Sequence, residues 1–171
     1  MSGRAGTGAR GTVARVQLPL LDRLIDDSPD QPRDPPISTA DSMALLRQSV
    51  RRDLEALLNA RRRWRSPPSV YKELSVSPIG FGIPDFTAGS FNDLRQREEL
   101  RLEIEDTIRR FEPRFLSVRA VLVDAKDRLE ATLRLRIEAV LHAEPAPEAV
   151  TFDTTIDPAS DEVSVRANEA G

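Results

Sequence analysis

The chain has 171 residues, 39% of them hydrophobic, which is enough for one domain of ordinary size with a packed core. Its formal net charge of -3 at pH 7 provides no overall positive field that would draw it onto nucleic acid or an anionic membrane. It has no cysteine, which excludes disulfides and thiolate metal sites, and it has neither a signal-peptide pattern nor an apolar run of the roughly 18 residues that span a membrane. We therefore expect a soluble, cytoplasmic protein.

The first 37 residues are expected to form a flexible tail that carries one short helix. Residues 1–15 are rich in glycine, arginine, alanine and threonine and should be disordered. A short amphipathic docking helix is predicted at about residues 18–26, because Pro19 suits a first helical turn and apolar residues follow at helical spacing. These apolar residues are Leu20, Leu21, Leu24 and Ile25. The helix can fold back onto its own domain or dock onto another protein, and the sequence leaves both open.

Two long amphipathic helices are predicted at the start of the main domain, residues 38–171. The first begins at Ser38 or Thr39, either of which can cap it, and runs to about Arg63, before the two prolines at 67–68. Its buried stripe is Met43, Leu46, Val50, Leu54, Leu57 and Leu58. The second helix spans roughly residues 92–111 and buries Leu100, Ile104, Ile108 and Phe111. Between the helices, residues 69–91 predict an ordered loop with a short strand near residues 70–76.

From Ser117 onward the apolar residues alternate with polar ones, which is typical of strands. Strands are predicted at residues 117–123, 129–141, 150–156 and 163–166, with a turn at 124–127 and a proline-containing break at 144–148. Helices followed by strands indicate an α+β domain. The expected fold has two main helices leading into a three- to four-stranded, mostly antiparallel sheet.

Few residues suggest catalysis, a metal or a cofactor. The single histidine, His142, falls on the polar face of a predicted strand, where a solvated side chain is expected. Glu112 is the exception, because the apolar neighbours Phe111 and Phe115 can raise a carboxyl pKa as a glycosidase acid requires. The simpler interpretation is a salt bridge to Arg114 or to an arginine of the first helix. Since the sequence places no second carboxylate beside Glu112, we predict no catalytic residues, no cofactor and no metal.

A basic cluster ends the first predicted helix. Arg61, Arg62 and Arg63 precede Trp64, and arginine beside an aromatic residue suits nucleic acid. The chain is acidic overall, however, and positive charge is favourable at a helix C-terminus in any case. We therefore predict no nucleic-acid partner and expect this cluster to form a protein interface or an internal clamp on acidic residues.

Four motifs occur in chain order: Leu-Leu-Asp-Arg-Leu at residues 20–24, Leu-Leu-Asn-Ala-Arg-Arg at 57–62, Gly-Ile-Pro-Asp-Phe at 82–86 and Glu-Pro-Arg-Phe at 112–115. Together they resemble the motifs of the TssE family, the lysozyme-like baseplate subunits of bacterial type VI secretion systems. Residues 57–62 (Leu-Leu-Asn-Ala-Arg-Arg) resemble the family's Leu-Leu-Asn-Thr-Arg-Arg, and residues 82–86 (Gly-Ile-Pro-Asp-Phe) resemble its Tyr-Gly-Leu-Pro-Asp-Leu loop. Residues 112–115 (Glu-Pro-Arg-Phe) resemble its Glu-Pro-Arg-Leu, and residues 20–24 resemble its N-terminal Ser-Leu-Leu-Asp-Arg-Leu. Ala60 and Phe81 depart from the family's threonine and tyrosine, and residues 65–79 are longer than its connection.

The resemblance implies a structural protein that helps nucleate contractile sheath assembly. It implies TssF, TssG and TssK as baseplate partners, TssB/TssC as the sheath partner, and a baseplate docked at the inner membrane without insertion into it. The residues expected to contact the sheath or the wedge are Glu112, Pro113, Arg114, Arg61, Arg62, Leu20, Leu21 and Leu24. Two alternatives stay open: a peptidoglycan hydrolase with Glu112 as general acid, and the equivalent wedge protein of a phage tail or another contractile injection system.

Overall fold

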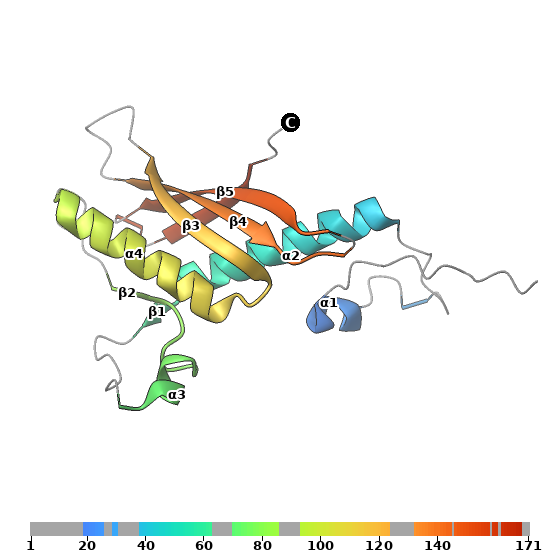
Figure 1. The fold of residues 1–171 in the computed structure, drawn as a ribbon, viewed down its shortest axis with the longest axis horizontal. Coiled ribbons are helices and arrows are strands. Elements are labelled where there is room, and N and C mark those ends of the chain that lie inside the picture. The colour runs from blue at the N-terminus through green and yellow to red at the C-terminus, as the bar shows by residue number, and fades with distance from the viewer. Residues whose placement is uncertain are drawn as a thin grey trace, which may run out of the picture.

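The structure is a computed structural model of the chain (Figure 1). It describes residues 19–25, 29–30, 38–62, 70–85, 93–123, 132–144, 146–157, 159–160 and 162–168. Several predictions concern residues outside these ranges and so are not addressed by the structure: disorder at 1–15, most of the tail between residues 26 and 37, the end of the basic cluster at 63–64, and the turn at 124–127.

A four-stranded antiparallel sheet forms one layer of the fold, in the order β3-β4-β5-β6. Its strands are β3 (Phe115–Val123), β4 (Leu133–Leu141), β5 (Glu148–Asp157) and β6 (Glu162–Ala167). In β4 and β5 buried residues alternate with partly exposed ones, because one face of the sheet packs on helices and the other does not. The period-two pattern therefore predicted all four strands, and the α+β fold is confirmed.

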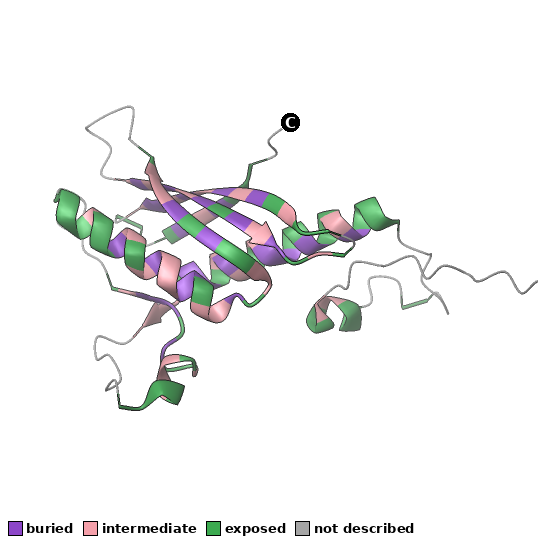
Figure 2. Cartoon of the chain, viewed as in Figure 1, coloured by how far each residue is buried: buried purple, intermediate pink, exposed green. Residues whose placement is uncertain are grey.

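Two long helices form the second layer on one face of that sheet (Figures 1 and 2). Helix α2 (Thr39–Asn59) packs on β6, and α4 (Leu94–Phe111) packs on β3. Ser38 caps α2 by accepting a hydrogen bond from the Asp41 amide at 3.1 Å, as its sequence position predicted. The predicted apolar stripes form the core, except that Met43 and Phe111 are only partly buried at its margin. Among the largest fully buried side chains are Leu54, Ile104, Ile137 and Phe152.

The first long helix ends earlier than predicted, at Asn59 rather than Arg63. Ala60 is extended (φ -74°, ψ 130°), and the next two residues form a short strand, β1 (Arg61–Arg62), parallel to β2 (Ile83–Pro84). Gly82 makes this pairing possible: its φ is +97°, and a Cβ there would lie 2.3 Å from the Ala60 carbonyl oxygen. Pairing with a distant segment thus ends the helix before the prolines do.

The strand predicted near residues 70–76 is wrong, because this segment contains a short helix, α3 (Lys72–Ser75). Local bonds close its turn: the Leu74 amide donates to the Tyr71 carbonyl at 3.0 Å, and the Ser75 hydroxyl donates to the Lys72 carbonyl at 2.6 Å. The Lys-Glu-Leu run also lacks the alternation of a half-buried strand. Near the tail, helix α1 (Leu20–Leu24) lies within the predicted range and buries none of its residues.

Candidate functional site

The corner between α4 and β3 is built by three consecutive residues. The Glu112 amide donates to the Ile108 carbonyl at 2.8 Å and closes the last helical turn. Pro113 cannot continue a helix, and β3 begins two residues later at Phe115. The Phe115 amide donates back to the Glu112 carbonyl at 3.3 Å. The corner therefore fixes the direction in which β3 leaves α4.

Glu112 and Arg114 bind each other across Pro113. Arg114 donates from Nε to Glu112 Oε1 at 2.6 Å and from Nη2 to Oε2, and its backbone amide adds a third bond to Oε1 at 3.2 Å. The Glu112 side chain is only 5% exposed. A buried carboxylate with both oxygens bound to a guanidinium makes a strong and geometrically specific pair. This confirms the salt bridge between Glu112 and Arg114 that the sequence suggested.

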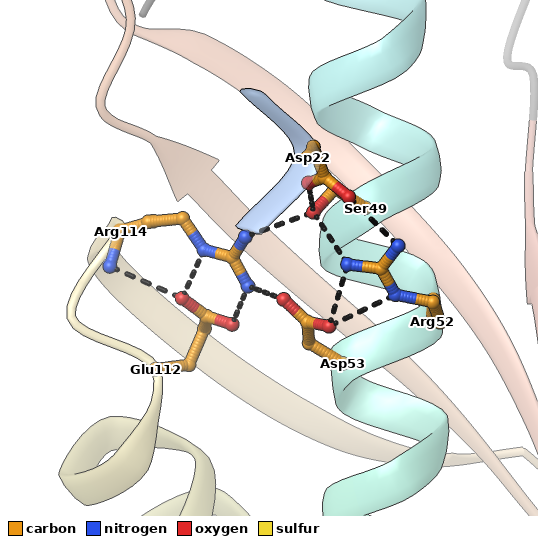
Figure 3. Close-up of polar contacts among 6 residues, drawn as sticks. All are labelled: Asp22, Ser49, Arg52, Asp53, Glu112 and Arg114. Carbon is orange, nitrogen blue, oxygen red and sulfur yellow. Dashed lines mark hydrogen bonds and ion pairs between the residues drawn. The ribbon is translucent and has the colours of Figure 1, made fainter. Parts of the chain in front are cut away.

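Arg114 also binds the middle of α2, as Figure 3 shows. Its Nη2 atom donates to Asp53 Oδ2 at 2.7 Å, and its Nη1 atom donates to Ser49 Oγ at 3.3 Å. Burial acts to lower the pKa of Arg114, but the bonds to Glu112 and Asp53 outweigh it and the pKa is raised. The guanidinium therefore stays charged and joins the corner to α2.

Asp22 extends this network to the N-terminal helix (Figure 3). It accepts hydrogen bonds from Ser49 Oγ at 2.6 Å and from Arg52 Nη1 at 2.8 Å. The bond from Arg52, followed by that from Ser49, lowers the pKa of Asp22 below its ordinary value. Arg52 also bonds Asp53 at 3.2 Å. We call the six residues of Figure 3 the corner network: Asp22, Ser49, Arg52, Asp53, Glu112 and Arg114.

The polar side of α1 faces α2, whereas its leucines face solvent. Leu20, Leu21 and Leu24 are 70%, 61% and 73% exposed. Asp22 thus holds the helix on its own domain (Figure 3), while its leucines are exposed. Of the two arrangements that the sequence left open, the structure shows the contact in cis, through Asp22, and docking of the exposed leucines onto another protein stays a prediction.

Arg61 and Arg62 lie apart from the corner network and bind within the domain. Arg61 donates to the Leu58 carbonyl at 2.8 Å, and Arg62 donates to Glu103 on α4 at 2.5 Å. The contact between Arg62 and Glu103 is an internal clamp on an acidic residue, one of the two arrangements expected for the basic cluster.

Sequence reasoning missed Asp22, Ser49, Arg52 and Asp53 as members of the site. Ser49 and Asp53 are four residues apart on α2, so both lie on its polar flank and point the same way. That spacing was a usable signal. The contact between Asp22 and Arg52 had no such signal, because the two residues are 30 positions apart in the sequence.

The corner network has the form of a structural ion-pair cluster. Both oxygens of Glu112 accept hydrogen bonds from Arg114, and Arg114 also bonds a second carboxylate, Asp53. His142 is exposed, and its backbone amide bonds the Arg114 carbonyl at 2.8 Å. Within the described ranges no three histidine, aspartate or glutamate side chains gather as metal ligands would. None of the described helices has the length and apolar character needed to cross a bilayer.

A comparison with protein-family models identifies the relatives of this chain. The model for baseplate wedge protein gp25 matches residues 44–146, more than half of the sequence. The matched part includes α4, β3, β4, most of α2 and the corner between helix and sheet. A search of curated proteins found no match. The chain therefore belongs to the gp25 family of baseplate wedge proteins, which are structural components of contractile phage tails and injection machines.

Proposed function

We propose that this chain is the TssE-type wedge subunit of a type VI secretion baseplate, and that it templates the first ring of the contractile sheath. The motifs at residues 20–24, 57–62, 82–86 and 112–115 favour this member of the family over a phage-tail wedge. In this role the chain is structural and not an enzyme. It acts in the cytoplasm, in a baseplate docked at the inner membrane.

The geometry of the corner network carries the proposal. Glu112 and Arg114 are occupied by bonds within the chain, so they serve a partner indirectly, by fixing the start of β3. β3 is an edge strand, and an edge strand can hydrogen-bond an extended segment of another protein. The Glu-Pro-Arg motif thus positions the edge to which a TssB/TssC sheath strand adds.

The tail supplies a second contact. The exposed leucines of α1 suit an apolar groove on a neighbouring baseplate subunit, and we assign this contact to the TssF, TssG and TssK assembly. In this view residues 1–37 dock the wedge into the baseplate, and residues 38–171 form the lysozyme-like wedge domain that the sheath contacts.

Sheath assembly in cells tests the proposal. Glu112→Ala and Arg114→Ala should sharply reduce the number of sheaths formed, as counted by fluorescence microscopy of a labelled sheath subunit. Arg136→Ala is a matched control, because it removes a half-exposed pair with Asp153 on the uncovered sheet face. Normal sheath counts in corner variants whose circular dichroism shows a folded protein would refute the role of the motif.

Two further measurements address the alternatives. Purified protein should release no muropeptides from peptidoglycan, and release that is lost in Glu112→Gln would establish a hydrolase instead. Affinity purification from native cells should recover secretion baseplate and sheath subunits, with less of them recovered from an Arg114→Ala strain. Recovery of phage-tail proteins would identify the other contractile machine.

A further inference from the structure

Side chains of the two long helices hydrogen-bond the backbone of both edge strands of the sheet, but they do so differently at the two edges. In β6 the backbone groups of Val163 and Val165 point away from β5, toward α2. In β3 the backbone amide and carbonyl of Ala120 point away from β4, toward α4. Exposed edges of this kind pair with other chains unless something covers them. What covers each edge therefore decides where the sheet can grow.

The β6 edge is covered by a row of side chains from α2 at two of its outward residues, Val163 and Val165. The Asn59 amide donates to the Val163 carbonyl at 2.8 Å and accepts from the Val163 amide at 2.9 Å, as the peptide group of a paired strand would. One turn before Asn59 on α2, the Glu55 carboxylate accepts a hydrogen bond from the Val165 amide at 3.2 Å. One turn before Glu55, the Arg51 side chain donates to the Val165 carbonyl at 3.3 Å. Two successive outward positions of this strand are thus satisfied.

The β3 edge is covered at one outward residue. Glu105 accepts from the Ala120 amide at 3.1 Å, and Arg101 donates to the Ala120 carbonyl at 2.9 Å. Val118 and Leu122 present their backbone groups on the same side, because orientation repeats every second residue. Among the described residues, these groups have no hydrogen-bond partner. A groove of about 620 Å³ runs beside them between α4 and β3.

The two residues that cover Ala120 both have another charged partner. Arg101 also bonds Glu98, at 2.7 and 2.8 Å, and Glu105 also bonds Arg109 at 2.8 Å. Each charge therefore keeps a partner when the bonds to Ala120 break. The side chain that covers Val163 on β6 differs in this respect. Among the described residues, the only other hydrogen bond of the Asn59 side-chain amide is to the Glu55 carbonyl of its own helix, so Asn59 has no charged partner to keep.

We propose that the sheet accepts a partner strand at the β3 edge only, and that the Arg101–Glu105 pair is a displaceable guard over that edge. The occupant is an extended backbone segment of the sheath, since donors and acceptors that repeat every second residue match a β-strand. This inference rests on the proposed function, in which the sheet adds a sheath strand. Beyond that function, the inference identifies β3 as the edge that binds the sheath strand, and the Arg101–Glu105 pair as the contact that covers this edge before the sheath binds.

Binding to purified TssB/TssC heterodimer tests the guard in the full chain. Arg101→Ala combined with Glu105→Ala removes both bonds to Ala120, so the variant should bind the heterodimer up to about a hundredfold more tightly, at roughly a factor of ten for each bond to a charged group. Hydrogen exchange of the Ala120 amide should speed up about tenfold, because only the bond to Glu105 protects that amide. Asn59→Ala is the matched control at the β6 edge and should give no gain in binding.

A second variant closes the β3 edge without touching the guard. Leu122→Pro removes an outward amide that has no described partner, a substitution that edge strands tolerate, so the protein should stay folded but lose sheath binding. If Leu122→Pro binds as the parent does, or if the guard variant neither binds more tightly nor exchanges faster, the inference is wrong while the proposed function stands. If neither the parent nor any variant binds the heterodimer, both are wrong.

Discussion

At the scale of single residues, Arg114 joins the corner to α2, because it contacts Glu112 at the corner and both Ser49 and Asp53 on the helix (Figure 3). One planar guanidinium satisfies a buried carboxylate beside it in the sequence and two residues on α2. A lysine has neither the fork geometry nor enough fixed donors to do the same. The motif therefore requires arginine, and not only a positive charge.

Replacing Arg114 should destabilise the domain strongly. Arg114→Ala leaves the Glu112 carboxylate buried without its charged partner, which costs about 3 kcal/mol of the free energy of unfolding. Urea denaturation measures this loss. Glu112→Ala combined with Arg114→Ala should cost less than the sum of the two single changes, because the residues interact directly. Additive losses would mean that the pair is not coupled.

Replacing Thr154 should stabilise the domain, whereas replacing Arg114 should destabilise it. Its hydroxyl group is buried in β5, and the described structure gives it no hydrogen-bond partner. Thr154→Val keeps the shape and removes the unsatisfied group, so the free energy of unfolding should rise by about 1 kcal/mol. Thr151→Val, at a partly exposed position of the same strand, is the control and should change stability little. Thermal unfolding compares the two variants.

At the scale of elements, α1 is held by polar contacts of one residue. In Asp22→Asn the ion pair with Arg52 is lost, so the amide of Ile25, which closes α1, should exchange faster while α2 stays protected. Because the pair is partly exposed, the loss in global stability should be below about 1 kcal/mol. Arg23→Ala on the exposed side of α1 should leave exchange unchanged. Equal exchange in all three proteins would show that Asp22 does not hold the helix.

The attachment of α1 should also depend on pH. The pKa of Asp22 is lowered in the folded protein, so its contribution is complete above the ordinary value of 3.8 and is lost as pH falls through the lowered value. Exchange of the Ile25 amide, corrected for the intrinsic effect of pH, should therefore accelerate in acid in the parent but not in Asp22→Asn. Acid acceleration of equal size in both would contradict this assignment.

Gly82 determines whether β1 and β2 can pair. Gly82→Ala should cost about 2 kcal/mol, because a side chain at positive φ is strained and its Cβ would collide with the Ala60 carbonyl. Urea denaturation measures the loss. A change below about 0.5 kcal/mol, the usual size for a surface substitution, would contradict the close approach.

Elements with strong periodicity could be predicted from the sequence, and contacts between distant segments could not. The alternation in β4 and the stripe on α2 depend only on one face being buried, and both were found. The end of α2 was missed because it depends on pairing with Ile83, a residue more than twenty positions away. At the site, Glu112 and Arg114 were found because they are neighbours in the chain, whereas their partners on α1 and α2 were not.

At the scale of the whole molecule, the tail and the main domain should be separable. Among the described residues, the buried core cluster runs from Leu46 to Val165, and α1 adds no residue to it. A chain of residues 38–171 should therefore fold, with a melting temperature within a few degrees of the full chain, since a loss below about 1 kcal/mol shifts it little. Circular dichroism checks this. A shortened chain that fails to fold would show that the tail is part of the domain.

The pairing of β1 with β2 has a consequence for how the chain can vary in length. Arg61 and Ile83 are partners, so the segment that leaves the domain at Arg62 returns beside its starting point before α4 begins. A chain segment that starts and ends at the same place can be lengthened or shortened without moving either long helix, since loop closure costs little more as a loop grows. The segment between Arg62 and Gly80 is therefore the place to insert a fluorescent domain into this wedge without disturbing its sheet edges.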